Sequence, residues 1–240
     1  MKPRTDSRKF KTISRRELLK LTPVLALGAF AIPQLQKPLL TGGLAFGDWA
    51  SARLFRSGHL APTFADADLT PFEKFPINDY DVDDPGVDFD KWTLTVTGSV
   101  QKPGDYTLAQ IQAASPKVTQ NTRHVCVEGW DVIGNFGGVR LSDFLKTIGA
   151  DPNASFVTVD CADDNYESLD MATAMHPQSL LCYEMYGQRL TREHGAPLRL
   201  NIPTKIGYKQ AKYVTDLKVS HVLERVGYWE DQGYSEFYGL

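Results

Sequence analysis

Short stretches in which apolar and polar residues alternate constrain the fold of this chain more than any other feature. Residues 92–98 (Trp-Thr-Leu-Thr-Val-Thr-Gly) alternate as the residues of a strand with one buried face do. Further strands are predicted at residues 120–128, 156–159, 180–185, 198–202 and 213–219. The predicted helices are short, at residues 108–114 after a capping Thr107 and at residues 143–148 after a capping Ser142. Strands outnumber helices and no regular strand–helix–strand spacing recurs, so we expect an α+β fold of mixed sheets with short helices.

Two connecting stretches carry weaker patterns. Residues 44–80 are rich in Gly, Pro, Asp and Phe and predict an extended arm wrapped on the body of the protein. Residues 102–105 (Lys-Pro-Gly-Asp) predict a turn.

The composition excludes several classes of protein. The 240 residues contain 26 Lys and Arg against 29 Asp and Glu, a formal net charge of −3, and no basic cluster occurs beyond the first twenty positions. We therefore expect no nucleic acid partner, since that binding needs clustered cations. The three cysteines form no Cys-x-x-Cys pair. A disulfide scaffold, a zinc ribbon and covalently attached haem are therefore excluded.

The N-terminus has the pattern of an export signal. Basic residues are followed at once by an apolar stretch, residues 18–32, which is shorter than the roughly 20 residues of a membrane span. Arg15 and Arg16, within residues 14–20 (Ser-Arg-Arg-Glu-Leu-Leu-Lys), resemble a twin-arginine signal. The alternative is a basic amphipathic helix at a membrane surface. Two segments have the small residues typical of a signal cleavage site, residues 29–31 (Ala-Phe-Ala) and 50–52 (Ala-Ser-Ala), and the sequence does not decide between them.

The export signal also predicts something about function. The twin-arginine route exports proteins that are already folded, typically around a cofactor inserted in the cytoplasm. We expect a periplasmic protein with a buried cofactor, with residues 1–45 as signal and linker and residues 46–240 as a single domain.

Cys126 is the first candidate for chemistry. A lone cysteine after a strand is usually a small buried apolar residue. Here Arg123 and His124 precede it and would favour the thiolate, which is the nucleophile and the metal ligand. Gly129, three residues on, permits the close backbone approach that a large planar cofactor requires.

A second constellation lies near the C-terminus. His194, Arg199, Lys205, Lys209 and Lys212 fall within a short span that also contains fixed-backbone glycines and prolines. The alternative interpretation is that these basic residues simply form a solvent-exposed surface. The glycines and prolines instead favour an anion cradle, in which an arginine fork grips a phosphate and a lysine supplies a point charge.

Taken in order, these motifs resemble the sulfite-oxidase-fold family of molybdopterin oxidoreductases. The likeness covers roughly residues 70–230, and the overall form is similar to the catalytic subunits of periplasmic protein-methionine-sulfoxide reductases. The segments that carry it are residues 126–130 (Cys-Val-Glu-Gly-Trp), 137–141 (Gly-Gly-Val-Arg-Leu), 194–199 (His-Gly-Ala-Pro-Leu-Arg) and 207–212 (Gly-Tyr-Lys-Gln-Ala-Lys).

The resemblance implies a role for each matching residue. Cys126 supplies a thiolate to molybdenum beside the two ene-dithiolate sulfurs of one molybdopterin. Tyr166 aligns with the active-site tyrosine of sulfite oxidases, which implies a proton or hydrogen bond given to the transferred oxygen. The remaining matches hold the pterin and its phosphate: Asn78, Tyr80, Asp81, Cys161, His194, Arg199, Gln210, Ala211 and Lys212.

The chain also departs from the family pattern. The reductases have Asn where His194 stands and Thr where Cys161 stands. Residues 75–77 (Phe-Pro-Ile) hold no sulfite-binding arginine, and Trp130 and its neighbours replace the arginines that follow the ligand cysteine in sulfite oxidases. A dianionic substrate needs paired cations, so these departures disfavour sulfite. The aromatic residues 227–234 are predicted to pack on the body.

The resemblance therefore implies a molybdenum-dependent oxidoreductase with one pterin per molybdenum. It would move an oxygen atom and two electrons to or from a small or protein-bound substrate, by reduction of a sulfoxide or N-oxide. One alternative is a sulfite-oxidising dehydrogenase, and another is a cofactor-binding protein without turnover. A third is a thiol enzyme using Cys126 with His124, which we disfavour by predicting that their side chains point oppositely on a strand.

The electrons must come from outside the chain. It carries no iron–sulfur cysteine set and no glycine-rich nucleotide fingerprint. We expect an external haem protein as redox partner and contact with a membrane only through that partner; the alternatives are a diffusible quinone or oxygen.

Overall fold

The computed structural model describes residue 38 and residues 41–43, 45–47, 49–50, 59–78 and 85–235. The chain divides into two compact units, Met1–Trp49 and Ala50–Leu240. Described residues between 38 and 50 are helical, and no described helix is long and apolar enough to cross a membrane. The twin-arginine segment, Tyr80 and Asp81 lie outside the described residues.

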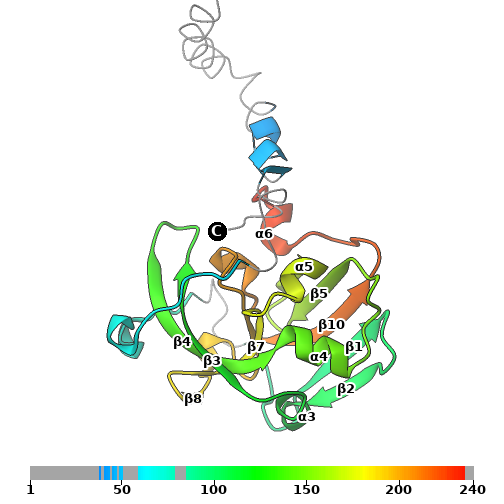
Figure 1. Ribbon diagram of the computed structural model, residues 1–240, viewed down its shortest axis with the longest axis horizontal. Coiled ribbons are helices and arrows are strands. Elements are labelled where there is room, and N and C mark those ends of the chain that lie inside the picture. The colour runs from blue at the N-terminus through cyan, green and yellow to red at the C-terminus, as the bar shows by residue number, and fades with distance from the viewer. Residues whose placement is uncertain are drawn as a thin grey trace, which may run out of the picture. The chain divides into compact units, whose positions relative to one another are not determined.

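The strands of the larger unit form two sheets on opposite sides of it (Figure 1). The first has the order β2 (Gly104–Thr107), β1 (Thr93–Gly98), β10 (Val214–Ser220), β5 (Phe156–Cys161) and β6 (Tyr166–Asp170). The second has the order β3 (Val118–Val125), β4 (Asp131–Arg140), β7 (Leu180–Met185) and β8 (Gln188–Arg189), with β9 (Arg199–Asn201) paired to β7. Among these pairs β1 with β10 is parallel and the others are antiparallel, which confirms the predicted α+β class.

Helices are short and connect the strands. The α-helices are α3 (Leu108–Gln112), α4 (Leu141–Thr147), α5 (Met171–Ala174) and α6 (Tyr228–Asp231). The 3-10 turns are η1 (Asp66–Asp68), η2 (Phe72–Lys74), η3 (Arg192–His194) and η4 (Gly207–Lys209). The prediction for Thr107 is confirmed: its side chain accepts from the backbone N–H of Gln110, which reaches back in a capping box.

The cap predicted at Ser142 is wrong. Helix α4 begins at Leu141, directly after β4, with Arg140 in the capping position and no side-chain cap. The backbone N–H of Leu141 donates to the carbonyl of Ser179 at 2.9 Å, so a neighbouring turn satisfies this end of the helix. The turn predicted at residues 102–105 is confirmed only in its first half: the chain bends at residues 101–102, and β2 already pairs with β1 from Gly104 onward.

The strand β4 escaped prediction because three glycines interrupt its pattern. Glycine inside a strand often marks a bulge or a close backbone approach. At Gly138 a Cβ would collide with the carbonyl of Leu181, and the register of β4 against β7 shifts between Gly137 and Gly138. Gly138 therefore allows β7 to pair at the bulge.

The main core lies on the inner face of the first sheet. The alternation read from residues 92–98 buries Leu94 and Val96 completely, and they join Val159, Leu217 and Phe144 in one apolar cluster. Within the predicted arm, residues 45–47 and 49–50 are helical rather than extended, whereas residues 59–78 lie along the second sheet. There Thr63 bridges Thr122 of β3, as the prediction of an arm on the body requires.

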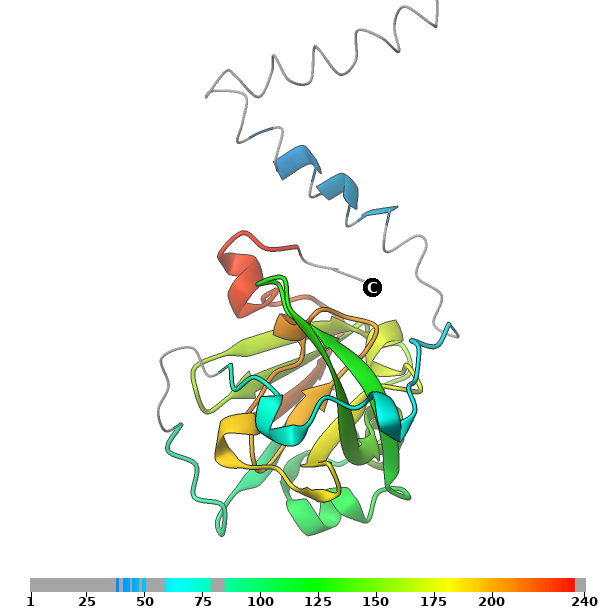
Figure 2. The ribbon, with the colours of Figure 1, turned by 90° about the vertical axis from the view of Figure 1, so that its left-hand side faces the viewer.

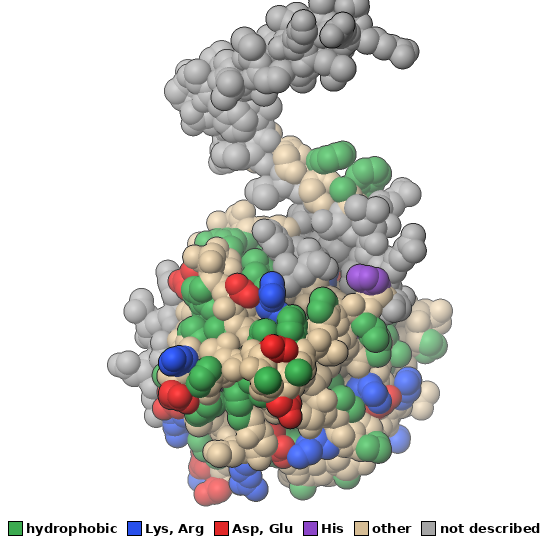
Figure 3. Space-filling view, turned by 60° about the vertical axis from the view of Figure 1, so that its left-hand side comes forward, with side chains coloured by type: hydrophobic (Ala, Val, Ile, Leu, Met, Phe, Trp, Pro, Cys, Tyr) green, Lys and Arg blue, Asp and Glu red, His purple; other side chains and the backbone are tan. Residues whose placement is uncertain are grey.

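The tip of the β3–β4 hairpin, η4 and α6 gather at one end of the larger unit (Figure 2). On the face shown in Figure 3, the described basic side chains stand singly or beside acidic ones rather than in a continuous basic field.

Candidate cofactor and active site

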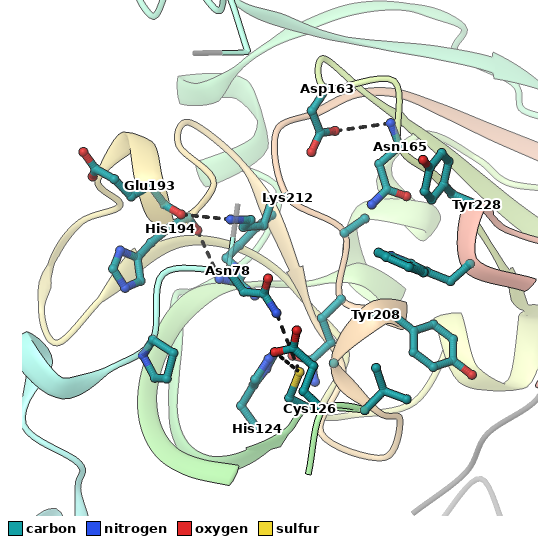
Figure 4. Close-up of a pocket in the computed structure, with 18 of the residues that line it drawn as sticks. Asn78, His124, Cys126, Asp163, Asn165, Glu193, His194, Tyr208, Lys212 and Tyr228 are labelled. Atoms are coloured by element: carbon teal, nitrogen blue, oxygen red, sulfur yellow. Dashed lines mark hydrogen bonds between the residues drawn. The ribbon is translucent and has the colours of Figure 1, made fainter. Parts of the chain in front are cut away.

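A cavity of about 450 Å³ opens where the β3–β4 turn, the β5–β6 turn, η3, η4 and α6 meet. Its wall brings together residues that are more than a hundred positions apart in the chain (Figure 4).

Cys126 directly follows β3, which ends at Val125, and it faces this cavity. Its backbone N–H donates to the carbonyl of Trp130 at 2.9 Å, and Gly129 closes this tight turn with a φ of 91°. The amide Nδ2 of Asn78 and a carboxylate oxygen of Glu128 each lie 3.6 Å from its Sγ. Burial raises the pKa of the Cys126 thiol, and a bound metal would favour its thiolate form.

His124 lies two positions before Cys126, and both side chains line the cavity. Our prediction that they point oppositely is therefore wrong, because residues i and i+2 of a strand share a face. Burial and the charge of Arg199 nevertheless lower the pKa of His124 to about 3. Its ring is neutral and a weak base near pH 7, which removes the support for a thiol enzyme activated by this histidine.

Arg199, on β9, is a buried cation at the cavity wall, with only 4% of its surface exposed. Its guanidinium donates to the carbonyls of His194, at 3.1 Å, and Leu200, at 3.4 Å. Within the described part of the chain no carboxylate forms an ion pair with it. A buried charge without a counter-charge is costly, so this site fits an anionic group such as the phosphate of a pterin.

His194 ends η3 beside Arg199 and lines the same cavity. Its Nδ1 bonds to the hydroxyl of Thr191 at 3.0 Å, whereas its Nε2 is buried without a hydrogen-bond partner. Burial, followed by the charge of Arg199, lowers the pKa of His194 to about 4, so the ring is neutral. The unsatisfied Nε2 fits a hydrogen bond to a bound group.

The loop after η4 completes the cradle. Gln210 accepts from Nδ2 of Asn201 at 3.1 Å and donates to the carbonyl of Lys205 at 3.3 Å, which fixes its side chain. A Cβ at Gly207 would lie 2.8 Å from the His124 ring, so only glycine lets this loop approach β3. On the other side, Lys212 Nζ donates to the carbonyl of Glu193 at 2.9 Å (Figure 4).

The structure brings most of the predicted site residues to one cavity and leaves two aside. Those that line it are Asn78, Cys126, His194, Arg199, Gln210, Ala211 and Lys212. Cys161 is buried at the end of β5 and does not line it; burial raises the pKa of its thiol well above the usual value. Tyr166 does not line it either. Its hydroxyl donates to the carboxylate of Asp231, and this bond raises its pKa to about 12.

Other lining residues received no role from the sequence. They are Glu128, Asp163, Asp164, Tyr228, Trp229 and Tyr234, among others. Glu128 lies inside the cysteine motif, and Asp163 and Asp164 lie two and three positions after Cys161, so proximity to motif residues was the available signal. The prediction that residues 227–234 only pack on the body is incomplete, because three of their aromatic rings form one wall of the cavity.

The fold and the cavity fit a protein that holds an anionic cofactor, because a cysteine sulfur and a buried arginine without a carboxylate partner in the described residues lie in one wall. Residues 81–229 match the family described as oxidoreductase molybdopterin binding domain, and the chain belongs to this family. It is a molybdenum-dependent oxidoreductase with a molybdopterin cofactor, and the residues of the cavity fit that group. The predicted kinship with sulfite-oxidase-fold enzymes is confirmed.

Individual relatives agree with this assignment. The chain is 43% identical over 196 residues to the "Putative protein-methionine-sulfoxide reductase subunit YedZ1" of Azospira oryzae, covering 81% of this chain and 73% of that protein. It is 28% identical over 244 residues to the protein-methionine-sulfoxide reductase catalytic subunit MsrP of Xanthomonas axonopodis pv. citri, covering 92% and 73%. Among solved structures, the sulfane dehydrogenase SoxCD from Paracoccus pantotrophus shares the fold with a TM-score of 0.52 at 23% identity, over 57% of this chain and 40% of that one.

Proposed function

We propose that this protein reduces a neutral sulfoxide, of the kind presented by methionine sulfoxide, in the periplasm. The observation that carries the proposal is the Cys126 sulfur facing a cavity of about 450 Å³ whose buried Arg199 has no carboxylate partner in the described residues. The substrate class is supported by the two relatives that are named as subunits of methionine-sulfoxide reductases.

The reaction balances with an external donor. The sulfur–oxygen bond of the sulfoxide breaks, the sulfur gains two electrons, and the oxygen leaves with two protons as water. When bound, the cofactor supplies the metal couple that accepts the oxygen and relays the electrons.

The chain's own residues would hold and orient the cofactor. The thiolate of Cys126 would bind the metal, with Asn78 donating to its sulfur. The carboxylate of Glu128 beside that sulfur is fixed by a 2.9 Å bond from the indole Nε1 of Trp130. Arg199 and the unsatisfied Nε2 of His194 would hold the pterin and its phosphate. Each of these groups is held by hydrogen bonds or packing, so binding requires little rearrangement.

Tyr228, Trp229 and Tyr234, which we call the aromatic wall, line the cavity, and we propose that the substrate binds against them. The ring of Trp229 makes edge contacts with Tyr228 and Tyr234, each with centroids 5.5 Å apart. Such rings exclude water and make favourable contacts with the sulfur and methyl groups of a thioether product. Proton donation by Tyr166 stays a prediction, and its hydroxyl already donates to Asp231.

The cavity gives little support to sulfite oxidation. Both histidines of the wall are neutral near pH 7, since their pKa values are lowered to about 3 and about 4. The wall therefore offers no paired cations to a dianion beyond those suited to the cofactor phosphate.

We further propose export through the segment that contains Arg15 and Arg16, and electron supply by a separate haem protein. The expected export rests on the sequence of residues 14–20. A docking haem protein need bury little area, because redox encounters are often weak and small.

Substrate profiling of the molybdenum-loaded protein tests the proposal. With a reduced dye as donor, we expect turnover of methionine sulfoxide and dimethyl sulfoxide, and little oxidation of sulfite by an oxidised dye. The matched control is Cys126→Ser protein loaded in the same way. Sulfite oxidation faster than sulfoxide reduction, or equal sulfoxide turnover by the control, would contradict the proposal.

A further inference from the structure

The cavity wall carries an uneven distribution of charge. Among the described lining residues four are acidic, Glu128, Asp163, Asp164 and Glu193, and two are basic, Arg199 and Lys212. In the view of Figure 4, Asp163 and Tyr228 stand on one side of the cavity and Glu193 and Lys212 on the other.

We assign the two basic residues, which both bond to carbonyls of η3, to the cofactor phosphate. The guanidinium of Arg199 is buried against the carbonyl of His194, and the ammonium of Lys212 bonds to the carbonyl of Glu193. Once a phosphate neutralises these cations, the remaining lining charge is negative. A small anion entering the cavity would then approach carboxylates without a compensating cation.

The Asp163–Asp164 pair is held in place by its loop. This β5–β6 turn is closed by the N–H of Cys161 donating to the carbonyl of Asn165 at 2.9 Å, and the carboxylate of Asp163 accepts from the N–H of Asn165 at 3.3 Å. Asp164 has a φ of 61°, a left-handed conformation that Asp and Asn tolerate better than most residues. The loop therefore presents two acidic side chains to the cavity in a defined arrangement.

We propose that the Asp163–Asp164 turn is a charge filter that admits neutral or cationic oxygen-atom donors and repels oxyanions. This inference rests on the proposed function, because it specifies the charge of the substrate that the same cavity accepts. The two residues are determinants of specificity that act through space on the substrate.

Two unreactive ligands of similar size, one neutral and one anionic, separate the effect of ligand charge on binding from any effect on the reaction. Dimethyl sulfone is neutral and methanesulfonate carries one negative charge. Trp130 and Trp229 line the cavity, so tryptophan fluorescence titration of the molybdenum-loaded protein can report the binding of both. The test variant is Asp163→Asn with Asp164→Asn, which keeps the acceptor toward Asn165 and suits the left-handed residue.

We expect the wild type to bind dimethyl sulfone more tightly than methanesulfonate. If each carboxylate lies about 8 Å from the ligand in a water-like medium, the pair changes anion affinity about sixfold, so the variant should bind methanesulfonate about sixfold more tightly. Its affinity for dimethyl sulfone should stay within about twofold, and the difference should shrink in about 1 M salt, where the Debye length is about 3 Å.

The control variant removes two acidic residues elsewhere, Asp105→Asn on β2 and Asp143→Asn on α4, neither of which lines the cavity. An unchanged methanesulfonate affinity in the test variant, an equal change in the control, or no saturable binding of either probe would overturn the inference. Dimethyl sulfoxide turnover is measured in parallel. Its absence, with the charge discrimination intact, would reject the proposed function and leave the filter standing.

Discussion

At the scale of single residues, the cavity is defined by polar groups whose partners the described protein does not supply. Arg199 is a buried cation without a carboxylate, and His194 Nε2 is a buried nitrogen without a hydrogen bond. Folding normally satisfies such groups, so their concentration beside Cys126 indicates that a bound ligand completes the site.

Replacing Arg199 tests this interpretation. Charge-assisted hydrogen bonds are worth about 1.5–3 kcal/mol each, so Arg199→Met should lower cofactor affinity about 10- to 100-fold per lost bond. The cofactor-free fold should keep its melting temperature within a few degrees, because removing the desolvated charge offsets the two lost carbonyl bonds.

Molybdenum and pterin content per chain measures the first effect, and thermal denaturation measures the second. Arg199→Lys is the matched variant, and it should retain an intermediate cofactor content because lysine supplies the charge without the fork. Full cofactor content in Arg199→Met would show that this residue does not hold the phosphate.

The stability of the protein should depend on His194 in the acid range. The folded pKa of about 4 lies below the ordinary value of 6.5, so the unfolded chain binds the proton more readily. The contribution is fully present above pH 6.5 and is lost as the pH falls toward 4. In cofactor-free protein the melting temperature of the wild type should therefore fall more steeply over this range than that of His194→Gln. Parallel curves for the two proteins would reject the assignment.

At the scale of elements, α6 is joined to the cofactor loop by buried charges. The ammonium of Lys209, in η4, pairs with Glu167 of β6 at 2.9 Å and with Glu230 of α6. Burial raises the pKa of Glu167 to about 8, and the positive charge of Lys209 opposes this rise. The cluster thus holds the aromatic wall beside the loop that contains Gln210.

Breaking this cluster should loosen the wall. Lys209→Met leaves two buried carboxyl groups without their cation, which typically costs about 3–5 kcal/mol. Lys218→Met removes an exposed pair with Glu224 and should cost at most about 1 kcal/mol. Chemical denaturation followed by tryptophan fluorescence compares the two, and equal losses would contradict a structural role for the buried cluster.

The elements also show where sequence reasoning succeeded. Alternation located β1, β5, β7 and β10 because each of these strands has a clear apolar face or run. It missed β4, where the close approach of β7 requires Gly138, since that need arises only after the two strands pair. For the site, Cys126 and Arg199 were found through local motifs, whereas the direction of the Tyr166 hydroxyl depends on Asp231, sixty-five residues away.

At the scale of the whole molecule, we propose that the cofactor is inserted before export and that electrons arrive afterwards. The paired arginines would couple these events, because the twin-arginine route carries folded proteins. Exchange of Arg15→Lys with Arg16→Lys should therefore leave active, molybdenum-containing protein in the cytoplasm. Cell fractionation with dye-coupled sulfoxide reduction measures this. Normal periplasmic accumulation of the variant would contradict export by this route.

X-ray absorption at the molybdenum edge tests the central claim, that Cys126 binds the metal of a molybdopterin cofactor. The experiment compares loaded wild-type protein with loaded Cys126→Ser, in which a harder oxygen replaces the sulfur. We expect the variant to retain molybdenum and pterin, held by the residues around Arg199, while the metal loses one sulfur neighbour and sulfoxide reduction stops. The same number of sulfur neighbours in both proteins would contradict the account.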